Sequence, residues 1–275
     1  MAKFINPFSD WGFKRIFGQD ISKDLLIDFL NNLFEGELVI KSISFKNNEQ
    51  IGLTEDSRGI IFDIYCTTSN DENIIIEMQN RSQTYFIDRA LYYTSRVIVN
   101  QGEKGEWDYK LTPVYTICFM NFIDKNLNNE KFRADLILAD KDTGRKVSDK
   151  IRITYLMLPL FNKNEDECSN NFDKWIFILK NMAVFERMPF MAKNAVFRKL
   201  AEISDITALS KDEQEKYGES LKILRDNYAI YKAAEKEGED RARYSMASKL
   251  LSKGFDIKDI CEITGLSIND IKNLN

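Results

Sequence analysis

The stretch Gly59–Gln79, GIIFDIYCTTSNDENIIIEMQ, decides the fold: two apolar runs flank a polar turn, yet Asp63, Glu77 and Gln79 interrupt them. Side chains alternate between the two faces of a strand, so Glu77 and Gln79 share one face of the second run. Burying a carboxylate is costly unless a partner compensates its charge. The stretch therefore predicts an antiparallel hairpin whose polar residues mark a site.

A register with the turn centred on Asn70 gives this hairpin an apolar face and a polar face. Its opposed pairs are Asp63 with Glu77, Ile64 with Ile76, and Ile61 with Gln79. Opposed Cβ atoms lie about 4.5–5.5 Å apart, close enough for two carboxylates to share one ion such as Mg²⁺. The alternative is a solvent-exposed face on which the carboxylates pair with Arg or Lys.

Composition limits the chemistry that is available to this chain. The 275 residues are 44% hydrophobic and carry a formal net charge of −4, so no overall basic field indicates a nucleic-acid partner. There is no histidine, which excludes imidazole as a base or metal ligand and leaves oxygen-ligated hard cations as the natural cofactors. The four cysteines are widely spaced, and neither a secretory signal nor a membrane span is recognisable, so we expect a cytoplasmic protein.

Helical and strand patterns alternate along the first part of the chain. We expect helices within residues 8–34 and 84–99, strands at 38–47 and 112–122, and a hairpin over 135–161 with its turn at Asp142–Gly144. Interleaved elements of this kind predict an α/β fold with helices packed on a mixed sheet. The composition becomes charged and helical beyond residue 210, so we expect two parts, 1–210 and 211–275.

Three spaced motifs carry a resemblance to a known family. They are D-x13-E-x-Q in the hairpin, D-x-x-x-K-x-x-F beginning at Asp10, and R-x-x-x-Y-x-x-R beginning at Arg89. Together they resemble the Rpn family of recombination-promoting nucleases and transposases, within the PD-(D/E)XK nuclease superfamily. The resemblance runs from about Asn6 to Phe122, and the helical tail is similar as well.

The resemblance implies a restriction-endonuclease-like mixed central sheet and a Mg²⁺-dependent endonuclease, with Mn²⁺ as a second candidate metal. Its substrate would be double-stranded DNA, in recombination or transposition. Asp63 and Glu77 would hold the metal, and Gln79 would complete the catalytic set where the superfamily usually has lysine. A neutral amide can hydrogen-bond but carries no charge. A non-catalytic DNA-binding or protein-interaction module that keeps the fold is therefore the alternative, and a defence or toxin nuclease is a third reading.

Further site residues are expected on the two helices that flank the hairpin in sequence. In the resembled fold an early helix supplies an acidic side chain, so Asp10 is a candidate metal ligand; Ser9 or Asp10 acting as a helix N-cap is the alternative. Lys14, four residues on, would contact phosphate or pair with Asp10. A second set shares one face of the later helix and would meet the DNA backbone or pack internally: Arg89, Tyr93 and Arg96.

The C-terminal stretch DIKDICEITGLSINDIKNL, beginning at Asp256, has the spacing of a helix-turn-helix, with Gly265 at the turn and Ser267 capping the second helix. Residues 256–275 contain four acidic and two basic side chains, a net charge of −2, which does not suit phosphate binding. We therefore expect a docking or homo-oligomerisation role for this tail, and no membrane partner.

Overall fold

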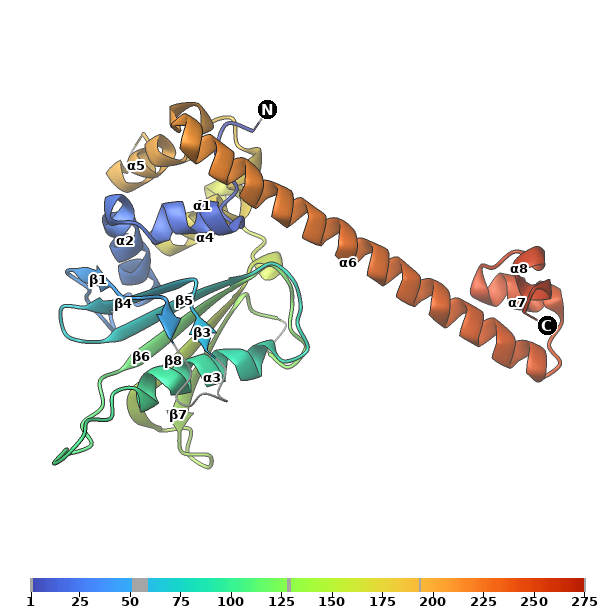
Figure 1. Ribbon diagram of the computed structural model, residues 1–275, viewed down its shortest axis with the longest axis horizontal. Coiled ribbons are helices and arrows are strands. Elements are labelled where there is room, and N and C mark those ends of the chain that lie inside the picture. The colour runs from blue at the N-terminus through green and yellow to red at the C-terminus, as the bar shows by residue number, and fades with distance from the viewer. Residues whose placement is uncertain (1, 51–58, 128–129, 193, 275) are drawn as a thin grey trace. The chain divides into compact units, whose positions relative to one another are not determined.

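The computed structural model describes residues 2–50, 59–127, 130–192 and 194–274 (Figure 1). The chain forms two compact units, Met1–Ser220 and Leu221–Asn275. The change in composition near residue 210 coincides with the start of α6 (Lys211–Ser252), whereas the two units divide within that helix. No helix among these residues is both long enough and apolar enough to cross a membrane.

A six-stranded mixed sheet forms the centre of the first unit. Its order is β1 (Ile43–Phe45), β4 (Ile64–Thr68), β5 (Asn73–Gln79), β6 (Val114–Met120), β8 (Lys146–Met157) and β7 (Arg133–Ala139). Strands β5, β6 and β8 are parallel, and the remaining pairs are antiparallel. The short strands β2 (Glu49–Gln50) and β3 (Ile60–Ile61) form a separate pair. The predicted mixed sheet and the 135–161 hairpin are confirmed.

Helices cover both faces of the sheet, as Figure 1 shows. The face that carries Phe119 of β6 packs against α1 (Asp10–Phe17) and α2 (Lys23–Leu33), and α4 (Asn171–Asn181) and α5 (Ala195–Ser204) pack on these two helices. The opposite face packs against α3 (Phe86–Val99), which connects the parallel strands β5 and β6. Short 3-10 helices occupy Asp20–Ser22, Leu158–Leu160, Glu165–Glu167, Met182–Val184 and Ile206–Ala208. The helices expected within 8–34 and 84–99 are confirmed.

Aromatic side chains fill the core between the helices and the sheet. Phe119 of β6 contacts Phe13 of α1 and Phe29 of α2, with ring centroids 5.5 and 5.3 Å apart. Trp175 of α4 closes this cluster against Phe17 at 5.8 Å. Buried aromatic pairs combine a large apolar area with specific ring geometry. The cluster therefore fixes α1 against the sheet, which matters for the site described below.

The central hairpin has the predicted register near its turn but not at its open end. Ile64 pairs with Ile76 as expected. Ile61 pairs with Glu49 of β2, so the predicted pairing of Ile61 with Gln79 is wrong. The chain bends at Asp63, where the Asn48 side chain donates a hydrogen bond to the Asp63 carbonyl (2.9 Å). This long-range contact takes the first apolar run out of the hairpin.

A close backbone approach positions the start of α1. Ser9 is the N-cap, and its hydroxyl accepts from the Gly12 amide (3.1 Å) and donates to the Asn6 carbonyl (2.9 Å). The alternative in which Asp10 caps the helix is therefore not adopted. A Cβ atom on Gly12 would overlap the Asn6 carbonyl oxygen and lie 2.7 Å from the Ser9 hydroxyl. Glycine is required here for space.

We predict that Gly12→Ala lowers the free energy of unfolding by about 1–3 kcal/mol, because the added methyl group forces the Asn6 turn away from α1. Urea denaturation followed by circular dichroism measures the change. Gly218→Ala in α6 is the matched control, because a Cβ atom there meets nothing within 4 Å. Alanine favours a helix over glycine by up to about 1 kcal/mol, so the control is expected to be neutral or stabilising. Equal losses in both variants would contradict the argument.

The second unit ends in two short helices packed on the end of α6. α7 (Ile257–Thr264) stops at Gly265, which has φ +69°, and Ser267 caps α8 (Ile268–Lys272). Ala247, Ile260 and Ile271 are fully buried in the small core between these helices. The turn and the cap lie at the residues that the sequence pattern indicates.

Candidate active site

The two hairpin carboxylates each accept a hydrogen bond from a backbone amide of the facing segment. Asp63 is half-buried at the bend before β4, and Glu77 is 4% exposed near the end of β5. The Asp63 amide donates to Glu77 Oε1 (3.3 Å), and Asp63 Oδ2 accepts from the Met78 amide (2.7 Å). The exposed-face alternative therefore does not describe Glu77. The two acids lie side by side directly beyond the last pair of the β4–β5 ladder, Ile64 with Ile76.

The raised pKa values of Asp63 and Glu77 indicate that nearby positive charge does not fully offset their negative charges. Burial and the negative charge of Asp63 together raise the pKa of Glu77 to about 8, and Arg89 partly opposes both effects. Burial also raises the pKa of Asp63, against the lowering effect of its hydrogen bond from Met78. Desolvation disfavours a carboxylate, and a nearby like charge adds to the penalty. A bound cation would offset both the burial of the charge and the repulsion between the acids.

Helix α1 brings two further charges toward Asp63. Asp10 forms an ion pair with Lys14 (2.8 Å), as one sequence alternative expects for Lys14. Asp10 raises the pKa of Asp63 and Lys14 lowers it, so both lie within electrostatic reach of the site. The Asn80 side chain, just after β5, donates to the Phe8 carbonyl just before α1 (2.7 Å). This bond ties the start of α1 to the strand that carries Glu77.

Helix α3 contributes Arg89 from the other side of the sheet. Arg89 Nη2 donates to Gln79 Oε1 (2.8 Å) and lies 4.0 Å from Glu77 Oε2. Sequence spacing placed Arg89 on a DNA-facing helix surface and gave no sign of its contact with Gln79. The two residues belong to different elements, and the polar position 79 facing an arginine-bearing helix is the signal that could have suggested it.

Of the other two residues expected on the DNA-binding face of α3, Tyr93 is half-buried and Arg96 is buried. Tyr93 packs edge-to-face on Phe62, with ring centroids 5.5 Å apart. Arg96 is 5% exposed. Arg89, Tyr93 and Arg96 do lie along one side of α3, but Tyr93 and Arg96 turn toward the sheet. The packing alternative describes Tyr93 and Arg96, and neither is carried into the interface that we propose.

The donor set at this site fits a hard divalent cation. Asp63 and Glu77 supply carboxylate oxygens, and Mg²⁺ is commonly bound by one or two carboxylates with water and substrate phosphate in its other positions. Within residues 2–50, 59–127, 130–192 and 194–274, no three Asp, Glu, Cys or His side chains converge on a metal position. Asp10 thus faces the site through its charge and its Lys14 pair, not as part of a three-acid cluster.

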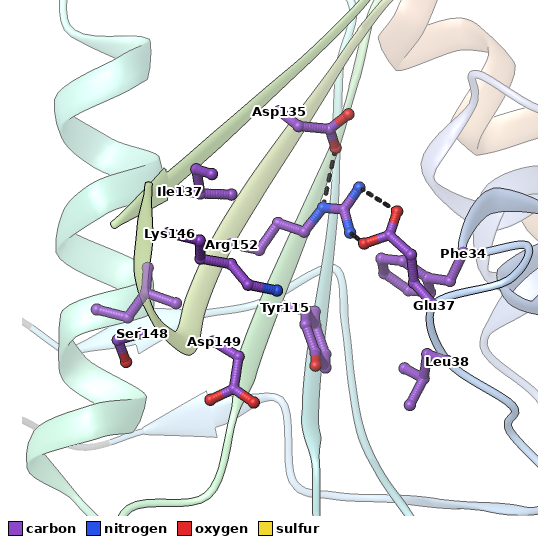
Figure 2. A pocket seen from close by; sticks show the side chains of 11 residues that line it. Phe34, Glu37, Leu38, Tyr115, Asp135, Ile137, Lys146, Ser148, Asp149 and Arg152 are labelled. Carbon is purple, nitrogen blue, oxygen red and sulfur yellow. Dashed lines mark hydrogen bonds and ion pairs between the residues drawn. The ribbon is translucent and has the colours of Figure 1, made fainter. Parts of the chain in front are cut away.

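A cavity of about 470 Å³ on the sheet face that carries Phe119 is a poorer candidate (Figure 2). Figure 2 shows the Arg152 guanidinium between Glu37 and Asp135, at 2.7 and 3.1 Å. These pairs raise the pKa of Arg152, although burial alone would lower it. Arg152 thus neutralises the acids that flank it. The residues that line the cavity include no pair of acids like Asp63 and Glu77, whose negative charges are not fully offset by neighbouring cations.

A mixed sheet flanked by helices, with Asp and Glu at adjacent strand ends, defines the PD-(D/E)XK class of nuclease folds. The chain matches the PD-(D/E)XK nuclease family transposases over residues 7–234 and belongs to that family. The family resemblance expected from the hairpin motif is thereby confirmed. Comparison with curated proteins and with solved structures finds no significant match. Family membership implies a nuclease-like protein with a DNA substrate, and nucleases of this class typically use divalent metals.

Proposed function

We propose that this protein is a divalent-metal-dependent endonuclease that hydrolyses phosphodiester bonds in double-stranded DNA. The observation that carries the proposal is the pair formed by the half-buried Asp63 and the buried Glu77, joined by hydrogen bonds to backbone amides near the end of β5. A core that needed only to be filled would gain nothing from two coupled carboxylates. Membership of a nuclease family supplies the reaction class.

Each site residue has a role that follows from its position. Asp63 and Glu77 would hold the metal, with Mg²⁺ favoured by their oxygen donors and Mn²⁺ as a substitute. When bound, such an ion lowers the pKa of a coordinated water and neutralises charge on the scissile phosphate. Lys14 and Arg89 flank the acids from opposite faces and would attract the DNA backbone. Asp10 would orient Lys14 and add a third carboxylate near Asp63 and Glu77. Gln79 would place its side-chain amide beside the reacting phosphate.

The cellular setting that we propose is DNA recombination or transposition in the cytoplasm; of these, the family's description as transposases supports transposition. The net charge of −4 offers no general attraction for DNA, so local cations and metal must meet the phosphates. We further propose that the C-terminal helices mediate homo-oligomerisation. The net charge of −2 over residues 256–275 argues against their reading DNA.

A second candidate is a DNA-binding or protein-interaction module that has lost catalysis. Two observations favour it. Gln79 replaces the usual lysine with a neutral amide, and no three acids converge in the part of the chain that the structure describes. The same fold would then bind DNA or protein without hydrolysis.

Metal removal separates the two candidates. We predict that purified protein nicks supercoiled plasmid in Mg²⁺ or Mn²⁺, and that EDTA or Glu77→Ala abolishes nicking, because the metal loses its ligands. Agarose gels measure the conversion of supercoiled to open-circular plasmid. A binding module would shift the plasmid on the gel without nicking it. Equal nicking by wild type and Glu77→Ala would show a contaminating nuclease or a site elsewhere.

A further inference from the structure

The last residue of the PD-(D/E)XK pattern is a lysine, and this chain has Gln79 at that position. The neutral side chain leaves Asp63 and Glu77 without the cation that the pattern carries on the same strand. Arg89 Nη2 lies 4.0 Å from Glu77 Oε2, so a positive charge does reach the acids from another element. The question is what holds this charge in place.

Hydrogen bonds on both ends fix the orientation of the Gln79 amide. Its Nε2 donates to the Arg81 carbonyl (3.2 Å), and its Oε1 accepts from Arg89 Nη2 (2.8 Å). A carbonyl can only accept and a guanidinium can only donate, so this assignment of the amide is the one that satisfies both neighbours. Gln79 is therefore committed to the arginine.

Arg89 is restrained along its whole length. Its Nη1 donates to Gln83 Oε1 (2.7 Å), and the guanidinium lies 5.0 Å from the Phe86 ring centroid and 5.8 Å from that of Tyr93. The side chain stays 30% exposed. A planar guanidinium held by amides and aromatic rings loses little entropy when it meets a phosphate. The restrained cation thus faces both the acids and the solvent.

We propose that Arg89 of α3 supplies the positive charge that lysine supplies in the family pattern, and that Gln79 is the positioning residue that holds it. This inference rests on the proposed nuclease function and deepens it. Because a guanidinium stays protonated, Arg89 stabilises negative charge on the scissile phosphate and does not take a proton from water. The substitution at position 79 then relocates a charge and does not remove it.

Moving the charge back to position 79 tests the proposal. We predict that Arg89→Ala slows single-turnover nicking of supercoiled plasmid in Mg²⁺ by about 10²–10³-fold, the range seen when one transition-state donor is removed. Gln79→Lys combined with Arg89→Ala is expected to recover at least about tenfold of that loss, since the strand again carries a cation. Duplex affinity in Ca²⁺, measured by fluorescence anisotropy, is expected to change less than about threefold in Arg89→Ala, because one phosphate contact contributes little to overall binding.

Several controls keep the outcomes distinct. Arg145→Ala removes an exposed arginine from the β7–β8 turn and is expected to leave nicking unchanged. Arg89→Met keeps an apolar stem over the rings should the alanine variant fold poorly, and it is expected to show the same loss. Nicking that persists in Glu77→Ala, or is absent from wild type, overturns the proposed function and this inference with it. Nicking that needs Glu77 but survives loss of Arg89, or a double variant no faster than Arg89→Ala, overturns the inference alone.

Discussion

Replacing Asp63 by asparagine is expected to slow plasmid nicking about a thousandfold while leaving the protein folded. The catalytic loss follows because an amide is a poor ligand for a hard cation, whereas the carboxylate is one of the two metal-holding groups that we propose. About 4 kcal/mol of transition-state stabilisation corresponds to this change. Single-turnover nicking in Mg²⁺ measures it.

The stability of the Asp63→Asn variant is expected to be unchanged or higher in the absence of metal. Burial raises the pKa of Asp63, so its ionised form is less favourable in the folded state than in water. Asparagine removes that charge and its repulsion of Glu77, while its side-chain oxygen still accepts from the Met78 amide. Urea denaturation at pH 8 in EDTA measures the difference. Activity and stability thus move in opposite directions.

Asp28→Asn is the matched control. Asp28 is also half-buried with a pKa raised by burial, and it accepts a hydrogen bond from Trp175 Nε1 (2.7 Å) in the helical layer. The same chemical change there is expected to leave nicking within about threefold of wild type, because the residue lies outside the site. Wild-type nicking by Asp63→Asn, or an equal loss in Asp28→Asn, would exclude the assigned metal ligand.

Metal binding is expected to strengthen steeply with pH up to about 8. The metal must displace the proton that Glu77 holds, and the pKa of Glu77 is raised to about 8 by burial and by Asp63. Below that pH, apparent affinity should fall about tenfold per pH unit for one displaced proton. Isothermal titration of the metal-free protein with Mn²⁺ at pH 6, 7 and 8 measures the trend, and nicking at subsaturating metal is expected to follow it.

The stability of the metal-free protein has the opposite trend. The usual pKa of Glu77 is 4.5 and its folded-state pKa is about 8, so the folded protein retains a proton that the unfolded chain releases. The free energy of unfolding should therefore fall as pH rises from about 5 to 8 and then level off with respect to this group. Glu77→Gln is expected to flatten this contribution. A decline that persists unchanged in Glu77→Gln would assign the effect to another group.

Sequence patterns predicted the features of this structure that depend on residues close together in the chain. Side-chain alternation gave the pairing of Ile64 with Ile76 and the meeting of Asp63 with Glu77. The bend at Asp63 escaped prediction because it depends on Asn48 and on pairing of Ile61 with the distant Glu49. A two-residue strand has too few side chains to produce a recognisable alternation.

The site shows the same division between local and long-range information. Helical spacing grouped Arg89, Tyr93 and Arg96 on one face of α3, which the structure agrees with. Spacing cannot say whether that face meets solvent or a sheet, and here it meets the sheet. The bond from Arg89 to Gln79 joins a helix to a strand, so it follows from tertiary packing and not from either pattern alone.

The turn of the central hairpin sets a rule for insertions. The Thr68 hydroxyl donates to the Glu72 carboxylate, and both residues are buried, so the turn has a fixed length. Strand faces alternate with every residue. An insertion that shifts β5 by one residue relative to β4 would place Glu77 on the other face of the sheet, away from Asp63. A shift of two residues would keep both acids on the same face. Among relatives that keep both acids, insertions and deletions in this turn should therefore involve an even number of residues.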